Sequence, residues 1–299
     1  MEIWIFFALL SSLLFAIVSV FDKYAVYDRS GISPSLLNMY VGYSNLLIGC
    51  IFLTFFLRSF NSSHILALSV GIIQGLSLIV LFWALKKLNV TRVMTMWSSY
   101  PFWVAFISFL FTNENLKLIQ IFFMIIIIIG SISSNIKLQD NTKLNFSLVS
   151  FFILVFGTIL FASSQVLNKE IISDISILEV YGLRGVGVCI TLAIPFSSKK
   201  NLTNLKKFIL NWNDSKYLFI AETLLATFAY LTILLALLTG PVSLVASISG
   251  TRPVFIVLIY IVLNLIGFKL SEKFIKGEVL IKLFSALCVG IGVFGIAYF

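Results

Sequence analysis

The sequence predicts an all-α integral membrane protein with ten transmembrane helices in two inverted five-helix repeats. Its composition is the first observation: 60% of the 299 residues are hydrophobic, only 11% are charged, and the mean hydropathy is +1.08. A soluble domain carries about a quarter charged residues, so most of this surface must face lipid. The other two observations are the number of apolar segments and an internal repeat.

Ten segments approach the roughly 20 apolar residues that a spanning helix needs. The segments are Ile3–Phe21, Leu36–Leu57, Ile65–Leu85, Val93–Phe111, Leu118–Ile136, Leu148–Leu167, Ile175–Phe196, Tyr217–Leu238, Val242–Phe268 and Val279–Phe299. The first has no basic start and no small-residue cleavage site, so we interpret it as a retained span and not as a signal peptide. Helices are expected because they satisfy every backbone polar group within lipid.

The chain repeats itself. The stretch Leu14–Lys23 and the stretch Leu160–Lys169, 146 residues later, are identical at five of ten positions. A second echo has an offset of 152 residues and joins Ala84-Leu85 and Pro101 to Ala236-Leu237 and Pro253. Two copies of one membrane unit are typical of transporters, in which duplicated halves enclose a site between them.

The segments divide five and five at the polar stretch Lys137–Asn145. We therefore expect one repeat in residues 1–140 and the other in residues 146–299. An odd number of spans per repeat gives the two copies opposite orientations, which places a binding site near the bilayer midplane. The longest connection, Ser197–Lys216, is predicted to be a basic loop without room for a soluble domain.

The Lys and Arg residues indicate an orientation, because short cytoplasmic loops are enriched in them. Loops after even-numbered spans hold 3 of these residues, namely Arg58, Lys117 and Lys169. Loops after odd-numbered spans hold 15, namely Lys23, Arg29, Lys86, Lys87, Arg92, Lys137, Lys143, Lys199, Lys200, Lys206, Lys207, Lys216, Lys269, Lys273 and Lys276. This bias places both termini outside the cell, and the net charge of +9 is mainly topological.

Ten spans in two related halves resemble the drug/metabolite transporter superfamily, and its EamA-like family in particular. The similarity is carried by the repeated stretches above, by Pro101 and Pro253, and by Glu114 and Glu272 before the last span of each half. The resemblance implies a multi-pass protein of the plasma (inner) membrane that exports amino acids or related metabolites, with proton coupling as an option. It also implies cytoplasmic termini, which conflicts with the charge bias, so sidedness stays open.

Charges inside spans are costly and mark candidate functional residues. Arg252 precedes Pro253 in a run of small polar residues that includes Thr251, so its guanidinium is placed to bind a carboxylate or phosphate. An ion-pair role or an interfacial position is the equal alternative for Arg252. Glu222 is the candidate coupling group, with a wet position at the membrane edge as its alternative. Arg184 lies among three glycines, which favours a structural role.

The counterpart of Arg252 in the first half is Tyr100, at the 152-residue offset. Trp97, Ser99 and Tyr100 before Pro101 therefore mirror the run before Pro253, which suggests an asymmetric site for an amphipathic solute, with an aromatic belt as the alternative. Further polar or aromatic candidates for the site are Gln74, Trp83, Gln165 and Tyr230, which are equally consistent with hydrogen bonds between helices.

Charged and amide residues end the repeated stretches. Asp22 and Lys23 close the first stretch, and Asn168 and Lys169 close the second. Interfacial anchoring is the simpler interpretation of these four residues, and a gate is the alternative.

The sequence gives no support for a cofactor, a metal or an enzyme. Cys50, Cys189 and Cys288 have no metal-ligand spacing, and the chain has one histidine, His64. A nucleotide-binding loop is absent, and neither a nucleophile–base pair nor a nucleic-acid partner is expected.

The leading hypothesis is a secondary transporter of a small organic solute in the lipid bilayer, working by alternating access. The alternative is a lipid-handling protein, such as a flippase for a lipid-linked phosphate, and a scaffold is a third option. The sequence leaves open the substrate, the direction, the coupling ion and whether the protein is a monomer or a homodimer.

Overall fold

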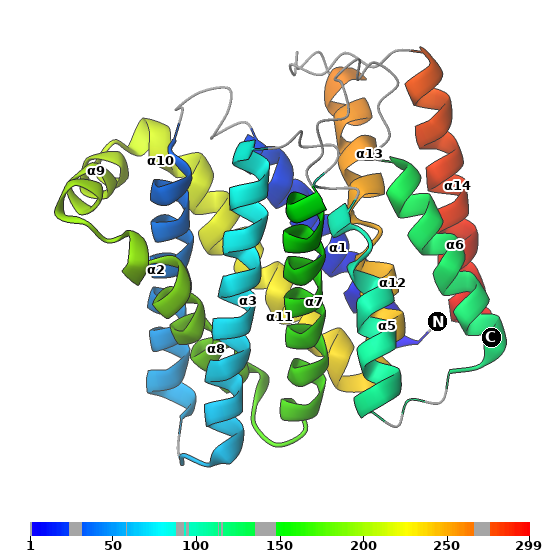
Figure 1. Cartoon of the computed structure of the whole chain (residues 1–299), viewed down its shortest axis with the longest axis horizontal. Coiled ribbons are helices and arrows are strands. Elements are labelled where there is room, and N and C mark those ends of the chain that lie inside the picture. Colours follow the sequence, from blue (N-terminus) through cyan, green and yellow to red (C-terminus); the bar gives the residue numbers. More distant parts are fainter. Residues whose placement is uncertain are drawn as a thin grey trace.

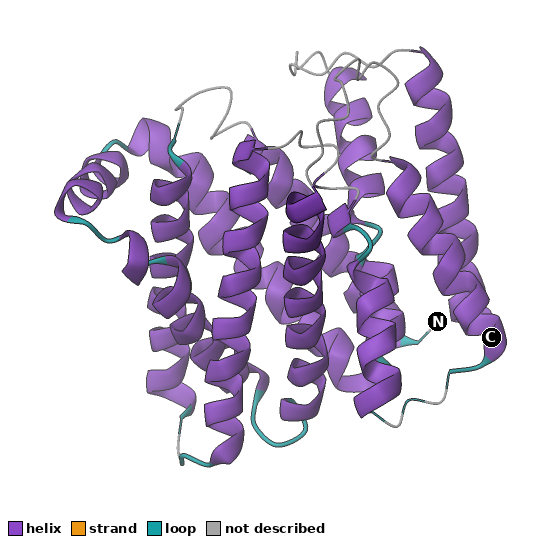
Figure 2. Ribbon diagram, in the orientation of Figure 1, coloured by secondary structure: helices purple, strands orange, loops and turns teal. Residues whose placement is uncertain are grey.

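The computed structural model describes the chain except residues 1, 24–31, 58, 88–92, 94–95, 113, 115, 135–147 and 266–275. Of the described residues, 89% are helical and none is in a strand, which confirms the predicted all-α class (Figures 1 and 2). The predicted seam at Lys137–Asn145, the side chains of Asp22 and Lys23, and Glu272 lie outside what the structure describes.

The helices stand side by side in one bundle (Figure 1). In chain order they are α1 (Ile3–Lys23), α2 (Pro34–Phe56), α3 (Ser62–Lys87), α5 (Tyr100–Phe111), α6 (Leu118–Ser134), α7 (Leu148–Ile171), α8 (Ile177–Leu192), η2 (Ile194–Phe196), α9 (Lys199–Leu210), α10 (Trp212–Leu218), η3 (Phe219–Leu225), α11 (Ala226–Thr239), α12 (Val242–Ser249), α13 (Arg252–Leu265) and α14 (Lys276–Tyr298).

Seven candidate spans in the described part of the chain are long and apolar enough to cross a membrane. They are Ile3–Phe21, Ser35–Phe56, Ser62–Ala84, Val149–Ile171, Ile177–Phe196, Ser215–Thr239 and Val242–Leu263. Three shorter apolar helices, Tyr100–Phe111, Leu118–Gly130 and Phe284–Ile296, lie where the sequence predicts spans four, five and ten. Large apolar side chains such as Phe55, Phe109 and Phe111 are more than three-quarters exposed, as expected for contact with lipid.

The ninth predicted span, Val242–Phe268, is found over Val242–Leu263, and a turn at residues 250–251 divides it into α12 and α13. One prediction about a connection is wrong. The predicted loop Ser197–Lys216 contains α9, an amphipathic helix whose buried Leu205 packs with Met39 and Leu218. The lysines of α9 lower its mean hydropathy and hide a helical repeat of apolar residues.

Glycines bring α8 into close contact with two neighbours. A Cβ atom at Gly49 of α2 would lie 2.7 Å from the carbonyl oxygen of Gly182 of α8. One at Gly71 of α3 would overlap the carbonyl group of Arg184. Small residues let helix backbones approach in this way, as the sequence predicts for this glycine-rich span. Arg184 is therefore held between α2 and α3.

The beginning of α1 and the end of α14 lie at the same end of the bundle. Trp4 packs against Gly240 in the turn between α11 and α12. The Nζ of Lys117, just before α6, donates a hydrogen bond to the carbonyl of Phe299 over 2.7 Å. These contacts join four parts of the chain that are remote in sequence, and Figure 1 shows the two termini near each other.

Candidate functional site

Both halves of the described chain contain a helix break at corresponding positions. Residues 98–99 form a turn before α5, and residues 250–251 form a turn before α13, at the same 152-residue offset. The backbone hydrogen bonds also correspond: Ser99 N–H donates to Met96 over 3.1 Å, and Thr251 N–H donates to Ile248 over 3.0 Å. The structure thus confirms the helix break that the sequence predicts before Pro253.

The two breaks lie against each other. A Cβ atom at Gly250 would be 3.0 Å from Cγ of Pro101, which is the second residue of α5. The hydroxyl of the buried Tyr100 donates a hydrogen bond to the carbonyl of Ala246 in α12 over 3.1 Å. A proline near the start of a helix leaves no hydrogen bond unmade, so each break is compatible with a stable helix after it.

The first residue of the helix after each break contacts a phenylalanine from the other half of the chain. Tyr100 packs edge-on against Phe161 of α7 with ring centres 5.0 Å apart. The guanidinium carbon of Arg252 lies 5.3 Å from the ring centre of Phe15 of α1. Phe15 and Phe161 are themselves 146 residues apart, which is the offset of the repeated stretches Leu14–Lys23 and Leu160–Lys169.

Arg252 is half-buried and also contacts Ser19. Its Nε donates to the Ser19 hydroxyl over 3.0 Å, and its Nη2 donates to the same oxygen. On the other side of the breaks, Trp97 lies 5.6 Å from Phe161, measured between ring centres. The structure therefore places a cation at one break and an aromatic pair at the other.

The hydroxyls at the breaks are engaged within the protein. Thr251 is fully buried, and its Oγ1 lies 2.9 Å from the hydroxyl of Ser12 in α1. The Ser99 hydroxyl donates back to the carbonyl of Met96 over 2.6 Å. In this conformation these two residues fasten the turns.

A second polar cluster lies deeper in the bundle around Arg184, which is only 5% exposed. Its Nε donates to Oε1 of Gln74 in α3 over 2.6 Å, and its Nη2 donates to Oδ1 of Asn45 in α2 over 3.2 Å. The guanidinium carbon lies 3.5 Å from the ring centre of Tyr230 in α11 and 5.2 Å from that of Tyr181. Three helices thus converge on one cation of α8.

The cluster continues into α7. The Tyr230 hydroxyl donates to Gln74 Oε1 over 3.3 Å, and Nδ2 of the buried Asn168 donates to that hydroxyl over 2.8 Å. The sequence assigns Gln74 and Tyr230 to the substrate and Arg184 and Asn168 to structure or gating, whereas the structure brings all four into one network. Asn45 completes it and is absent from the sequence-based candidates. An amide in the middle of the apolar span two was the available signal.

Lys169 and Glu114 hold the turn between α11 and α12 from its two sides. Nζ of Lys169 donates to the carbonyls of Leu237 and Gly240, over 2.7 and 3.0 Å. The Glu114 carboxylate accepts hydrogen bonds from the Val242 and Ser243 N–H groups and the Ser108 and Ser243 hydroxyls. A cation at a helix end and an anion at a helix start both favour the backbone dipole.

Glu114→Gln is expected to lower the thermal midpoint of unfolding in detergent. The amide keeps the size of the side chain but removes the charge at the start of α12, at a cost of about 1–2 kcal/mol. The matched control is Glu170→Gln, since Glu170 is exposed at the end of α7. Equal midpoints for the two variants would show that the cap adds no stability.

The remaining candidates have simpler surroundings. Glu222 is half-buried within the π-helical segment η3, about two turns after the start of the candidate span Ser215–Thr239. The neighbouring Thr223 hydroxyl is 3.2 Å from that of Tyr40 in α2. Trp83 packs on an apolar cluster with Ala84, and Gln165 is buried in α7. Segments of π-helix are frequent at functional positions, so Glu222 remains a candidate.

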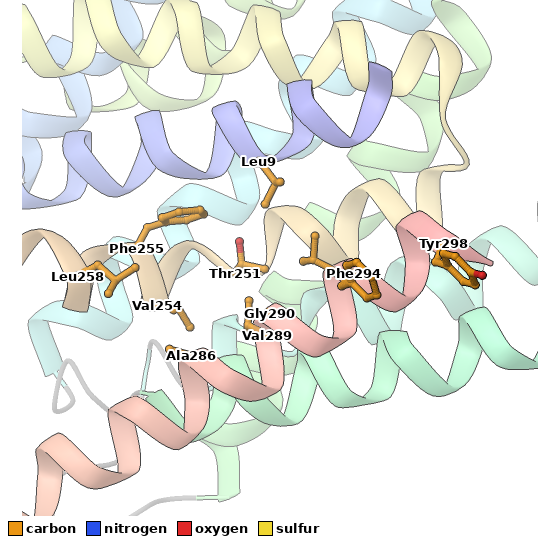
Figure 3. A pocket seen from close by; sticks show the side chains of 11 residues that line it. Leu9, Thr251, Val254, Phe255, Leu258, Ala286, Val289, Gly290, Phe294 and Tyr298 are labelled. Carbon is orange, nitrogen blue, oxygen red and sulfur yellow. The ribbon is translucent and has the colours of Figure 1, made fainter. Parts of the chain in front are cut away.

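A cavity of about 520 Å³ lies beside the second break (Figure 3). Helices α1, α13 and α14 line it with apolar residues such as Leu9, Val254 and Phe294, and Thr251 is among its few polar residues. Figure 3 shows Thr251 on one side and Gly290 on the other. The cavity includes the last helix, α14, and its lining suits apolar groups.

Comparisons with known proteins point to one family. The sequence model of the EamA-like transporter family, which belongs to the drug/metabolite transporter superfamily, matches residues 2–136. A protein of known crystal structure has the same fold, with a TM-score of 0.70 and 13% identity, over 99% of this chain and 96% of that chain. The search of curated proteins finds no match. The match confirms the resemblance predicted from the sequence for residues 2–136.

Proposed function

With residues 2–136 in the EamA-like transporter family, we propose that the chain is a secondary transporter of a small organic metabolite, such as an amino acid. It exports this solute by alternating access between two inverted repeats of five spans, at a site where the helix breaks meet. The family supplies the membrane transport of small molecules. The substrate, the direction of transport, the proton coupling and the alternating-access mechanism are our proposal.

The observation that carries the proposal is the correspondence between the two breaks. Tyr100 and Arg252 start helices at equivalent positions and rest on the equivalent phenylalanines Phe161 and Phe15. Interrupted helices at the interface of two repeats are how many secondary transporters bind solutes. A solute with an apolar part and an anionic group could contact the aromatic pair at one break and the guanidinium at the other.

The packing of the helices supports two repeats. Exchanging the halves turns α1 into α7, α2 into α8, α3 into α11 and α6 into α14. The contact of α1 with α11 then becomes that of α7 with α3, and the pairs α2–α8 and α6–α14 map onto themselves; all four contacts are present. A twofold relation of this kind, with both ends of the chain on one side, favours ten crossings with opposite orientations.

Alternating access needs each side of the bundle to open and close in turn. Lys169 and Glu114 fasten the α11–α12 turn at the end where Trp4 lies. Release of these caps would free α12 to move relative to α1. In this scheme Asn168 and Lys169 belong to the gate at that end, and Asp22 and Lys23 are their counterparts at the other.

Uptake into proteoliposomes tests the function. The purified protein is reconstituted and offered each of the radiolabelled proteinogenic amino acids, with and without a pH gradient. We expect saturable uptake of one or a few of them above protein-free vesicles. Lack of uptake of every amino acid, in vesicles whose protein is folded, would contradict this substrate class.

Glu222→Gln is expected to abolish the response to the pH gradient while counterflow of labelled against unlabelled solute continues. A carboxyl that carries the coupling proton is needed for the coupled cycle and not for exchange. Glu2→Gln is the control, because Glu2 is exposed at the start of α1. Unchanged pH dependence in Glu222→Gln would remove this residue from the coupling mechanism.

The cavity beside Thr251 favours a second candidate, a flippase for a lipid-linked phosphate. Its apolar lining and the exposed Leu258 and Phe294 fit an acyl chain that enters from the bilayer. A fluorescent anionic phospholipid in the same vesicles distinguishes the two, because only a lipid-handling protein accelerates its exchange between leaflets.

A further inference from the structure

Arg184 is a buried cation whose described neighbours include no carboxylate. Among the described residues, the hydrogen-bond and ring partners of Arg184 are neutral groups only. These are the amide oxygens of Gln74 and Asn45 and the faces of Tyr230 and Tyr181. A charge removed from water needs a counter-charge, and dipoles and rings replace it in part.

The guanidinium also keeps unused donors. Its Nη1 is buried and makes no hydrogen bond with any described group. A guanidinium has five N–H donors in a planar fork, a geometry that matches a carboxylate. A purely structural arginine at this depth would be expected to use both ends of the fork.

An unused acceptor occurs in the same network. Asn168 gives its Nδ2 to Tyr230, while its Oδ1 is buried and accepts no hydrogen bond from the described residues. Tyr230 connects the two unsatisfied residues, since its ring covers Arg184 and its hydroxyl accepts from Asn168. Buried polar atoms without a partner are rare in native proteins, so two in one network require an explanation.

We infer that the network of Arg184, Gln74, Tyr230 and Asn168 is a binding site for an organic carboxylate that also carries a hydrogen-bond donor. The carboxylate binds the free end of the Arg184 fork, and its donor reaches Oδ1 of Asn168. Tyr230 contacts both residues, with its ring over the Arg184 guanidinium and its hydroxyl bound to Nδ2 of Asn168. The inference rests on the proposed transport function for its role as a substrate site, and it gives that substrate a negative charge.

Gln74→Glu tests the missing counter-charge. The new carboxylate lies where Gln74 Oε1 already accepts from Arg184, so the variant supplies internally what the ligand supplies in the wild type. We expect the thermal midpoint without ligand to rise by about 5 °C and the response to added carboxylate to disappear. A midpoint that is unchanged or lower would show that Arg184 already has a counter-charge, which would overturn the inference.

Thermal shift in detergent measures the response. The probes are sodium lactate, sodium propionate and zwitterionic alanine, with lactamide as the uncharged analogue of lactate and sodium chloride and sodium phosphate as the anion controls. We expect lactate and alanine to stabilise the wild type most, propionate less, and lactamide not at all. Stabilisation by chloride or phosphate alone would identify an inorganic anion site and overturn the assignment to carboxylates.

Arg184→Gln is expected to weaken the carboxylate response at least tenfold in half-saturating concentration, while Lys207→Gln on the exposed face of α9 leaves it unchanged. Asn168→Leu is expected to remove the preference for lactate over propionate. The two proposals fail separately. Transport that persists in Arg184→Gln with the same preference for carboxylates would overturn this site, whereas carboxylate binding without transport by the wild type would overturn the proposed function.

Discussion

Gly187→Val is expected to prevent α8 from packing between α2 and α3. A Cβ atom at Gly187 would lie 2.7 Å from the amide nitrogen of Ile72 and 2.9 Å from the carbonyl carbon of Gly71. Both are backbone atoms of α3, so no side chain can rotate away. Overpacking of this kind costs about 3 kcal/mol, and a β-branched residue adds a second methyl to the clash.

The measurement is size-exclusion chromatography of a fluorescent fusion, followed by thermal unfolding of the monodisperse fraction. We expect Gly187→Val to lose most of the monodisperse protein. Gly290→Val in α14 is the matched control, because a Cβ atom there meets nothing within 4 Å. Similar profiles for both variants would show that α8 does not contact α3 through this glycine.

The contact between α8 and α3 illustrates which parts of the fold the sequence could predict. Spans one, three, seven and eight are found within a few residues of their predicted bounds, because uninterrupted apolar runs of this length determine a helix in lipid. The glycines of α8 predict a close approach, yet their partners Gly49 and Gly71 are identified only in three dimensions. The spacing of glycines along α8 does not indicate which helix packs against them.

The breaks could be predicted in part. Pro253 after small polar residues favours an interruption, and the offset of 152 residues extends this expectation to Pro101. The contacts Tyr100–Phe161 and Arg252–Phe15 could not be derived, because phenylalanine is abundant in this chain and its lipid-facing and buried copies have the same sequence pattern. Only the corresponding offsets distinguish these two from the other rings.

The contacts of Arg184 could not be predicted from the sequence. Its neighbouring glycines favoured a structural role, but the network with Asn168 and Tyr230 depends on five helices meeting at one depth. Hydropathy predicts that a polar residue lies within a span. It does not predict which side of the helix that residue occupies or which helices it contacts. The role of such residues therefore follows from unsatisfied atoms, which are properties of the packed structure.

Arg252→Ala is expected to reduce uptake of the transported solute at least tenfold and to leave the protein folded. The guanidinium is the one positive group that the described structure places at the two breaks, where it lies on Phe15 and Ser19. Loss of a single charge-assisted contact to a solute is worth about 1.5–3 kcal/mol, which is a factor of ten or more. Because Arg252 is only half-buried, truncation should leave packing largely intact.

The comparison with Arg252→Lys separates charge from shape. Lysine retains the positive charge but not the planar fork, so an intermediate uptake would indicate a bidentate contact with the solute. Lys117→Ala is the control, since Lys117 is exposed and contacts the chain end at the edge of the bundle. Uptake in Arg252→Ala equal to that of Lys117→Ala would place solute recognition away from the breaks. The deeper network around Arg184 would then be the remaining cationic site, and the carboxylate response of that network would decide whether it acts alone.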